Sequence, residues 1–251
     1  MKRLGSPIER HLIVCNSYWQ LKVGVNGYEN STTHELATQV LPGRTFRVIE
    51  APDLEEGKTP AVTRVRVNLM EDGYLCWLDL AALFGSAFQI DIWNPVLFSK
   101  AEIYRRLPAV LHWVESAAKA PNQYLWGGSI GPDFDCSGLV QTAFASQSIW
   151  LPRDAYQQEG FCTQIPVAAN DFSLLRPCDL LFFGSKDHCD HVALYRGDGY
   201  YLHSSGREYG RNGIGCDGLH PKDNNPIANH YRARLRGVGR VERCHDGTTL
   251  S

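Results

Sequence analysis

The sequence lacks any long apolar run. Its first residues, MKRLGSPIERHLIVCNSYW, include basic side chains, but the apolar stretch from Leu12 to Cys15 stops at Asn16 and is too short for the h-region of a secretory signal. No other stretch approaches the roughly 18 apolar residues that a membrane-spanning helix needs. We therefore expect a cytoplasmic protein that does not insert into a membrane.

The sequence also lacks a strong net charge and closely paired cysteines. Its 25 Lys and Arg residues against 27 Asp and Glu residues leave a formal net charge of −2, so no overall field would hold it on nucleic acid or anionic lipid. The eight cysteines are scattered and include no C-x-x-C pair, and without an export signal we expect free thiols. The glycine clusters at 127–128 and 210–215 have neither a P-loop lysine nor a dinucleotide fingerprint. We predict no nucleic-acid partner and no organic cofactor.

The N-terminal part is rich in short segments with β character. The alternation of apolar and polar residues is clearest at 62–69, and Gly, Pro, Asn and Asp clusters separate the segments. We predict a small β-barrel over residues 1–95, with strands at 11–15, 20–25, 45–50, 62–69 and 74–78.

A helix is predicted to link this domain to the rest of the chain, over residues 99–120. Ser99 and Glu102 form a capping box, and apolar residues recur after it at helical spacing. Pro108 should kink or divide this helix.

Residues 121–245 change in character. A glycine-rich loop is followed by a helix that begins near Cys136, and then by strands at 180–183, 191–195 and 200–203. A helix that precedes hairpin-connected strands predicts an α+β domain rather than a parallel sheet.

Cys136 is the candidate nucleophile. It precedes apolar pairs at helical spacing and therefore falls in the first turn of a helix, where the amide dipoles should lower the thiol pKa. Free cysteine is among the most buried residue types, so a structural role for this residue stays open at this stage.

His191 and His203 are the candidate base and its orienting partner, because a thiol needs a base and the base needs a partner on its other ring nitrogen. They lie on two strands joined by the turn Arg196-Gly-Asp-Gly199. A turn centred on Gly197 places them opposite each other on one face, whereas a two-residue turn at 198–199 places them on different faces. We favour the first register; the alternative is that both are ordinary strand-edge histidines.

The second half of the chain resembles the NlpC-type cell-wall cysteine peptidases of the papain-like superfamily. The residues that carry the resemblance are Tyr124-Leu-Trp-Gly-Gly128, Asp135-Cys-Ser-Gly-Leu-Val140, Arg176-Pro-Cys-Asp-Leu-Leu-Phe-Phe-Gly184, His191-Val-Ala-Leu-Tyr195 and Tyr201-Leu-His-Ser-Ser-Gly206. The resemblance implies Cys136 as nucleophile, His191 as base and His203 as the orienting residue. It also implies a place for Tyr124 near the oxyanion.

A closer resemblance covers nearly the whole chain, to the cyanobacterial-type γ-D-glutamyl-L-diamino acid endopeptidases, in which a bacterial SH3-like domain precedes the peptidase domain. Trp150-Leu-Pro-Arg-Asp-Ala-Tyr-Gln-Gln158 and His203-Ser-Ser-Gly-Arg207 are similar to that subgroup. It implies cleavage of wall-derived peptides with a free N-terminal L-Ala during murein recycling. Glu71-Asp-Gly-Tyr74 matches the segment whose tyrosine touches the peptide's amino end, although Leu75-Cys76 departs from the subgroup's pattern.

The substrate-binding candidates each have a structural alternative. Asp135 could bind an ammonium group or cap the helix at Cys136, and these roles are compatible. Arg153 and Asp154 could line the pocket or form a helix start. Residues beside the catalytic candidates complete the set, namely Ser137 and Ser204.

Two rival functions remain. His188-Cys189-Asp190-His191 could contribute to a structural zinc site, although neighbouring strand residues point to opposite faces. A catalytically inactive module that binds a wall peptide is the other rival, and the presence of Cys136, His191 and His203 together argues against it. The sequence leaves open the oligomeric state and whether diaminopimelate or L-Lys follows the scissile bond.

Overall fold

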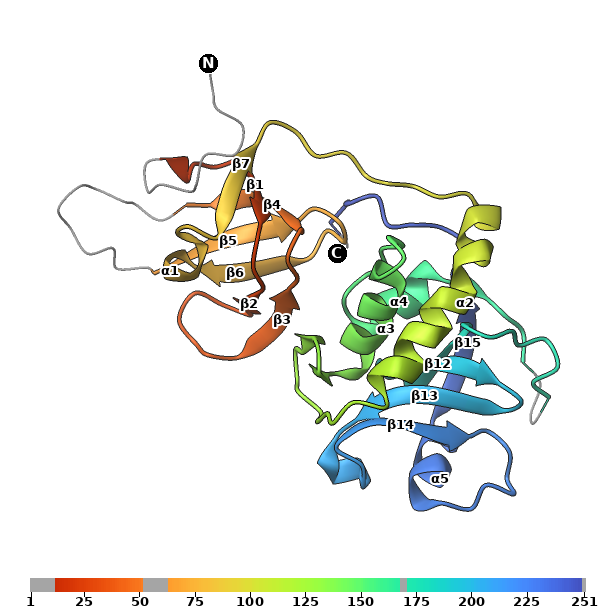
Figure 1. Ribbon diagram of the computed structural model, residues 1–251. Coiled ribbons are helices and arrows are strands. Elements are labelled where there is room, and N and C mark those ends of the chain that lie inside the picture. The colour runs from red at the N-terminus through yellow and green to blue at the C-terminus, as the bar shows by residue number, and fades with distance from the viewer. Residues whose placement is uncertain (1–11, 52–62, 168–170, 250–251) are drawn as a thin grey trace. The chain divides into compact units, whose positions relative to one another are not determined.

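The structure is a computed structural model that describes residues 12–51, 63–167 and 171–249 (Figure 1). The chain divides into two compact units, one formed by residues 1–95 with 246–251 and the other by residues 96–245. The last residues of the chain thus belong to the N-terminal unit, where the Asn68 side-chain amide donates a hydrogen bond to Thr249.

The N-terminal unit is built on one antiparallel sheet of the described residues. Its strands lie in the order β3-β2-β6-β5-β4-β1-β7. Alternating side chains such as Trp19, Phe46 and Leu69 are fully buried in its core. The elements are β1 (Tyr18–Leu21), β2 (Val25–Tyr28), β3 (Leu36–Val40), β4 (Thr45–Glu50), β5 (Arg64–Leu69), β6 (Leu75–Asp79), the short helix α1 (Leu80–Leu83) and β7 (Ala87–Ile90).

The strand predictions for this unit are partly confirmed. The predictions at 45–50, 62–69 and 74–78 correspond to β4, β5 and β6, although residue 62 lies outside the described residues. The prediction at 11–15 is wrong for residues 12–15, which form no strand, and residue 11 is not described. The prediction at 20–25 spans the end of β1 and the start of β2, because the turn between them also contains apolar valine. β3 and β7 were not predicted, since their polar residues interrupt the apolar alternation.

Buried charges hold the turn that leads into β6. Arg44 is almost fully buried and donates to Glu71 at 3.2 Å and to Asp72 at 2.5 Å. Glu71 also accepts the backbone N–H of Thr45, and Asp72 accepts that of Tyr74. The backbone at Tyr74 is therefore fixed by an ion cluster, since buried charges are tolerated only with partners.

The C-terminal unit begins with the long helix α2 (Lys100–Ala117). The predicted capping box is confirmed: Glu102 N–H donates to the Ser99 hydroxyl, and Ser99 N–H donates to the Glu102 carboxylate. The helix runs through Pro108 without a break, so the proline does not divide it, and the kink stays a prediction. Buried Val110 and Val114, two and six residues after the proline, anchor this segment in the core.

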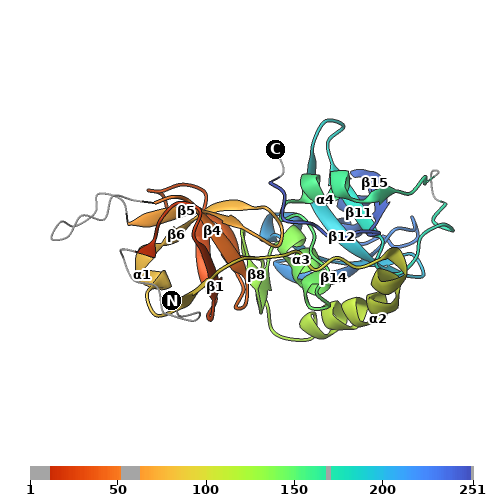
Figure 2. The same cartoon turned by 90° about the horizontal axis from the view of Figure 1, so that it is seen from above.

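The sheet of this unit is antiparallel, with the order β10-β15-β11-β12-β13-β14. One core cluster joins α2 and α3 to one face of the sheet, and a second cluster joins α5 to the other face (Figure 1). Helix α3 lies between α2 and α4 (Figure 2). The elements are β8 (Ser129–Ile130), β9 (Asp133–Phe134), α3 (Cys136–Ala145), α4 (Ala155–Phe161), β10 (Thr163–Gln164), β11 (Leu180–Gly184), β12 (Cys189–Gly197), β13 (Tyr200–Ser205), a 3₁₀ turn (Arg207–Tyr209), β14 (Gly213–Gly218), α5 (Pro226–Arg232) and β15 (Leu235–Arg240).

In the hairpin of β12 and β13, His191 and His203 share one face, as expected, but the strands pair in a register that was not expected. Gly197 pairs with Tyr200, so the turn is the two-residue one, with positive φ at both turn residues, 198 and 199. Tyr195 nevertheless pairs with Tyr201, which leaves residue 196 as an extra residue in β12. The predicted turn centred on Gly197 is thus wrong. The two-residue turn alone would have put His191 and His203 on different faces, and the bulge at residue 196 returns them to the same face.

Candidate active site

Cys136 is the first residue of helix α3, as predicted from the apolar spacing. Asp135 is the N-cap residue, and its carboxylate accepts the backbone N–H of Gly138 at 2.6 Å. A Cβ atom at Gly138 would lie 2.1 Å from the carbonyl oxygen of Gly128, so only glycine lets the helix start pack against the preceding loop. The close approach of Gly138 to Gly128 therefore helps to place the nucleophile.

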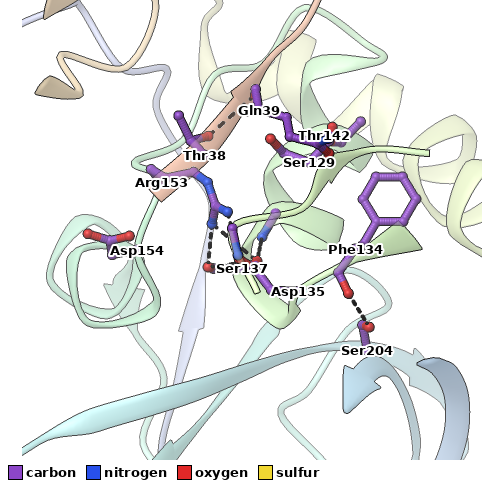
Figure 3. A network of polar contacts seen from close by, with 12 residues as sticks. Thr38, Gln39, Ser129, Phe134, Asp135, Ser137, Thr142, Arg153, Asp154 and Ser204 are labelled. Carbon is purple, nitrogen blue, oxygen red and sulfur yellow. Dashed lines mark hydrogen bonds and ion pairs between the residues drawn. The ribbon is translucent and has the colours of Figure 1, made fainter. Parts of the chain in front are cut away.

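A buried polar cluster surrounds the residue before the nucleophile (Figure 3). The guanidinium of Arg153 makes a bidentate contact with Asp135, at 3.1 and 2.6 Å, and also donates to the Ser137 hydroxyl at 2.9 Å. The same carboxylate accepts the N–H groups of Gly127 and Gly138 and the hydroxyl of Ser137. Five donors on one carboxylate thus link the loop at Gly127 to the first turn of α3, which carries the cysteine.

The environment of the Cys136 thiol differs from the expected one. Burial raises its pKa to about 12, and the neighbouring charge of Asp135 adds to this, while backbone hydrogen bonds from Val192 and Ser137 and the charge of Arg153 oppose it. The prediction that the helix start lowers the thiol pKa is therefore wrong for this structure, because desolvation outweighs the dipole. Contact with the backbone at Val192 brings the sulfur to the strand position next to His191.

His191 and His203 are directly hydrogen-bonded, which confirms that they share a face of the hairpin. Nε2 of His191 lies 2.8 Å from Nδ1 of His203, and both residues are buried. Burial lowers the pKa of His191 well below 6.5, and the charges of His203, Arg234 and His230 act in the same direction. Burial likewise lowers the pKa of His203. Both rings are therefore neutral near pH 7, and Nδ1 of His191 is the ring nitrogen not engaged by His203.

Asp217, which no pattern in the sequence indicated, continues this arrangement. Its Oδ2 lies 2.8 Å from Nε2 of His203, and both side chains have no exposed surface. Arg211 donates to both oxygens of the carboxylate at 2.8 and 2.7 Å, and Asn225 donates to Oδ1 at 3.0 Å. No local pattern marks these residues, because Asp217 meets His203 only through the pairing of β13 with β14.

Tyr231 of α5 is a second residue that the sequence analysis missed. Its ring stacks on His191 with a centroid distance of 4.3 Å and meets His203 edge-on at 4.7 Å. Its hydroxyl hydrogen-bonds Ser205 at 2.6 Å. Burial raises the pKa of Tyr231, and Cys136 contributes to the shift, so this ring lies near the thiol as well as the base.

Tyr124 lies close enough to the nucleophile for Cys136 to influence its pKa, and its place near the oxyanion stays a prediction. Burial raises its pKa, and the next largest contributions come from Cys136 and Asp135. Tyr124 forms an isolated bridge with Phe134, the residue two positions before the cysteine. A neutral phenol therefore stands next to the thiol.

The other predicted substrate residues have structural contacts. The Ser204 hydroxyl donates to the carbonyl of Phe134 at 2.6 Å, which ties β13 to the segment before the nucleophile (Figure 3). Asp154 is the N-cap residue of α4, and its N–H donates to Gln157 at 3.4 Å. The helix-start alternative is thus observed for Asp154, and the cap alternative for Asp135. Tyr74 lies in the N-terminal unit, and its contact with a peptide stays a prediction.

The zinc alternative finds no support in the parts of the chain that the structure describes, where no three His, Cys, Asp or Glu side chains are grouped to hold a metal. Cys189 is buried while Asp190 is exposed, as expected for neighbouring strand residues. The segment His188–His191 therefore does not converge on one point. Among the described residues, no helix is long and apolar enough to span a membrane.

Comparison with known proteins identifies both parts of the chain. Residues 121–230 match the model of the NlpC/P60 family, and residues 28–83 match that of the bacterial dipeptidyl-peptidase Sh3 domain. Both matches agree with the resemblances drawn from the sequence.

Curated relatives cover part of the chain. The gamma-D-glutamyl-L-lysine dipeptidyl-peptidases of Bacillus cereus and Bacillus subtilis are each 40% identical over 84 residues, which are 32% of this chain and 24% and 27% of those proteins. The probable endopeptidase YafL of Escherichia coli is 36% identical over 116 residues, 44% of each chain. This chain thus matches less than half the length of each of these relatives.

Among solved structures, a NlpC/P60 family protein from Bacillus cereus aligns with 90% of this chain and 64% of its own, at 22% identity and a TM-score of 0.45. The matched segments contain Cys136, His191, His203 and Asp217 in the second domain and Tyr74 in the first. Residues 121–230 therefore form an α+β domain of the NlpC/P60 family, and the domain that precedes it matches a bacterial dipeptidyl-peptidase SH3 domain over residues 28–83.

Proposed function

We propose that the protein is a γ-D-glutamyl-L-diamino acid endopeptidase that removes L-Ala-γ-D-Glu from wall-derived peptides with a free amino end. The observation that carries the proposal is the pairing of an NlpC/P60 domain with an SH3 domain of the dipeptidyl-peptidase type. The names of the two Bacillus relatives, gamma-D-glutamyl-L-lysine dipeptidyl-peptidase, support this bond type. A dipeptidyl-peptidase releases two residues from a free N-terminus, which is the specificity proposed for this chain.

The proposed reaction begins from a neutral thiol and a neutral imidazole. Burial raises the pKa of Cys136 and lowers that of His191, so a separated thiolate and imidazolium are disfavoured before substrate binds. Transfer of the thiol proton to the free ring nitrogen of His191 therefore accompanies attack of sulfur on the γ-carboxamide carbon of D-Glu. His203 holds the imidazole at its other nitrogen.

The developing oxyanion needs donors at the start of α3. Backbone N–H groups of the first helical turn have no helical acceptor, and the phenol of Tyr124 lies beside the sulfur. Such donors stabilise the tetrahedral intermediate because they are in place before charge develops. The C–N bond then breaks, and His191 delivers its proton to the departing amine.

The second half of the reaction restores the enzyme. Water attacks the thioester at Cys136, giving up a proton to His191, and the C–S bond breaks. The proton returns to sulfur. The products are L-Ala-γ-D-Glu with a free γ-carboxylate and a peptide whose diamino acid has a free α-amine; no metal or organic cofactor takes part.

The free amino end is the finer part of the proposal. Tyr74 and Asp135 are the proposed contacts, although the five donors on the Asp135 carboxylate leave it a secondary partner for an ammonium group. Ser137 and Arg153 hold that carboxylate in place, so their effect on binding is through Asp135. Peptides with a free N-terminal L-Ala arise by wall breakdown, and we therefore place the protein in cytoplasmic recycling.

The test is digestion of L-Ala-γ-D-Glu-diaminopimelate and its L-Lys counterpart by the purified protein under reducing conditions, with mass analysis of products. We expect L-Ala-γ-D-Glu from at least one of them and slow cleavage of the N-acetylated peptides. A site that selects on a buried polar group discriminates by roughly 10⁴-fold, against about 10²-fold for apolar fit. Equal rates with and without the acetyl group would refute the recycling role, and binding without cleavage would favour the inactive module.

A further inference from the structure

We propose that Asp217 is a positioning residue that sets the tautomers of both histidines, so that Nδ1 of His191 presents its lone pair to the thiol. The kinetic part of this inference rests on the proposed function, whereas the tautomers themselves can be observed without any substrate.

Asp217 can only accept hydrogen bonds. Burial raises its pKa, but the hydrogen bond from His203 and the charge of Arg211 outweigh burial, and the pKa lies below its ordinary value. The group is therefore an ionised carboxylate, with Arg211 and Asn225 donating to it. The remaining contact, at 2.8 Å, is with Nε2 of His203, so this nitrogen must carry the proton.

That assignment determines the next bond. A neutral imidazole with a proton on Nε2 has a lone pair on Nδ1. Nδ1 of His203 lies 2.8 Å from Nε2 of His191, which must therefore be the donor. His191 then has its proton on Nε2 and its lone pair on Nδ1, the form that can accept a proton from Cys136.

The surrounding structure is built to hold this carboxylate. Gly215 of β14 pairs with His203 in the sheet, and a Cβ atom at Gly215 would lie 1.9 Å from Nη1 of Arg211. The glycine therefore leaves the room that the guanidinium occupies against Asp217. Asn225 caps α5 with its oxygen, which accepts the N–H of Ala228, and turns its amide donor to Asp217.

The decisive variant is Asp217→Asn, which changes one atom. Arg211 donates to both oxygens and Asn225 only to Oδ1, so the amide oxygen is expected at the Oδ1 position and the amide N–H₂ then faces His203. Nε2 of His203 must accept, which reverses both histidine tautomers and puts a proton on Nδ1 of His191. A comparable reversal in a serine-protease triad costs about 10⁴ in kcat, and we expect a loss of at least roughly 10²-fold with KM changed less than about threefold.

Asp179→Asn is the matched control. Asp179 is equally buried, and Arg240 binds both of its oxygens at 2.7 Å, but it contacts neither histidine. Both variants thus lose a buried carboxylate–guanidinium pair, but only Asp217→Asn is expected to change the tautomers of His191 and His203. We expect the folded control to retain the kcat of the natural chain.

The pH profile adds a readout that a stability defect would not move. In Asp217→Asn only hydroxide can take the thiol proton, so the rate should keep rising with pH where the natural chain has reached its plateau. The charged and titratable groups around Asp217 are the same in both chains, namely His203, Arg211, Tyr201, Cys216, Asp223, Arg232 and Tyr231.

Ring ¹⁵N chemical shifts of the natural chain give the test that needs neither a variant nor a substrate. We expect the Nε2–H form for both His191 and His203 near neutral pH. An Nδ1–H form at His203, or an Asp217→Asn variant with unchanged kcat and pH profile, would overturn the proposal. If the natural chain cleaves no peptide, the proposed function fails, and these shifts together with the alkylation rate of Cys136 still decide the role of Asp217.

Discussion

Two buried aspartate–arginine pairs next to the catalytic candidates have similar composition and different surroundings. Asp135 meets Arg153 before the nucleophile, and Asp217 meets Arg211 behind the histidines. The first carboxylate also contacts backbone N–H groups, whereas the second contacts an imidazole. One ion pair therefore fixes the path of the chain, and the other fixes the position of a proton.

Solvent access separates the pairs further. The Arg153 side chain is 1% exposed and that of Arg211 is 23% exposed. Removal of Arg153 leaves a space enclosed by protein beside Asp135, whereas removal of Arg211 leaves a space that water can enter beside Asp217, which itself has no exposed surface. We therefore expect the nucleophile side of the site to govern folding stability and the base side to govern catalysis.

The largest effect is expected at the nucleophile and the base, Cys136 and His191. Cys136→Ala and His191→Ala should each reduce kcat by at least about 10⁴-fold, because the thiol forms the covalent bond and the imidazole moves its proton. Circular dichroism and peptide turnover check the fold and the rate. A chelator serves as the control and should leave turnover unchanged, and appreciable turnover by either variant would contradict the assignment.

Arg153→Met tests the nucleophile-side pair. It should lower the free energy of unfolding by about 3–5 kcal/mol, because Asp135 remains buried without its ionic partner. Arg211→Met should cost less, about 1–3 kcal/mol, because water can enter where the partly exposed guanidinium was and Asp217 keeps its donors His203 and Asn225. Urea unfolding of both variants makes the comparison, which fails if the two losses are equal.

His203→Ala tests the base-side pair. We expect a loss of about 10²–10³ in kcat, less than for His191→Ala, because His203 orients the base without moving the substrate's proton. Steady-state kinetics on the tripeptide measure it. A loss confined to KM would instead assign His203 to substrate binding.

The pH dependence follows from the burial of both histidines. The pKa of His191 lies well below 6.5 in the folded chain because of burial and nearby positive groups, so kcat/KM should hold at pH 6.5 and fall only at lower pH. The unfolded chain binds protons below pH 6.5 where the native chain does not, so the free energy of unfolding should decrease as the pH falls below that value. Denaturant titrations between pH 5 and 8, together with pH–rate profiles, measure both.

The smallest effect is expected at Tyr231, whose ring lies against His191 and near Cys136. Tyr231→Phe removes the hydrogen bond to Ser205 and keeps the stack on His191, so it should cost about 1 kcal/mol of stability and leave kcat within about threefold. Tyr231→Leu also removes the ring and should lower kcat further. Thermal unfolding and kinetics of the pair separate the hydroxyl from the ring, and a similar kcat in both variants would remove the stack from the argument.

The sequence by itself determined the features that obey local rules. The helix starts at Ser99 and Cys136 were predictable because a cap and its helix lie within a few residues of each other. The same holds for the order of the strands that carry His191 and His203. The thiol pKa was not predictable, since the dipole is local but desolvation depends on which elements cover the sulfur.

Only the tertiary structure decided how the histidines connect. An extra residue at Arg196 sets their common face, and one inserted residue reverses every side chain beyond it, so no reading of the turn alone could settle it. Asp217 and Tyr231 join the site from β14 and α5, each by a contact across the fold rather than along the chain. Local spacing carries no information on such contacts, because they exist only once the sheet has paired and α5 has packed against it.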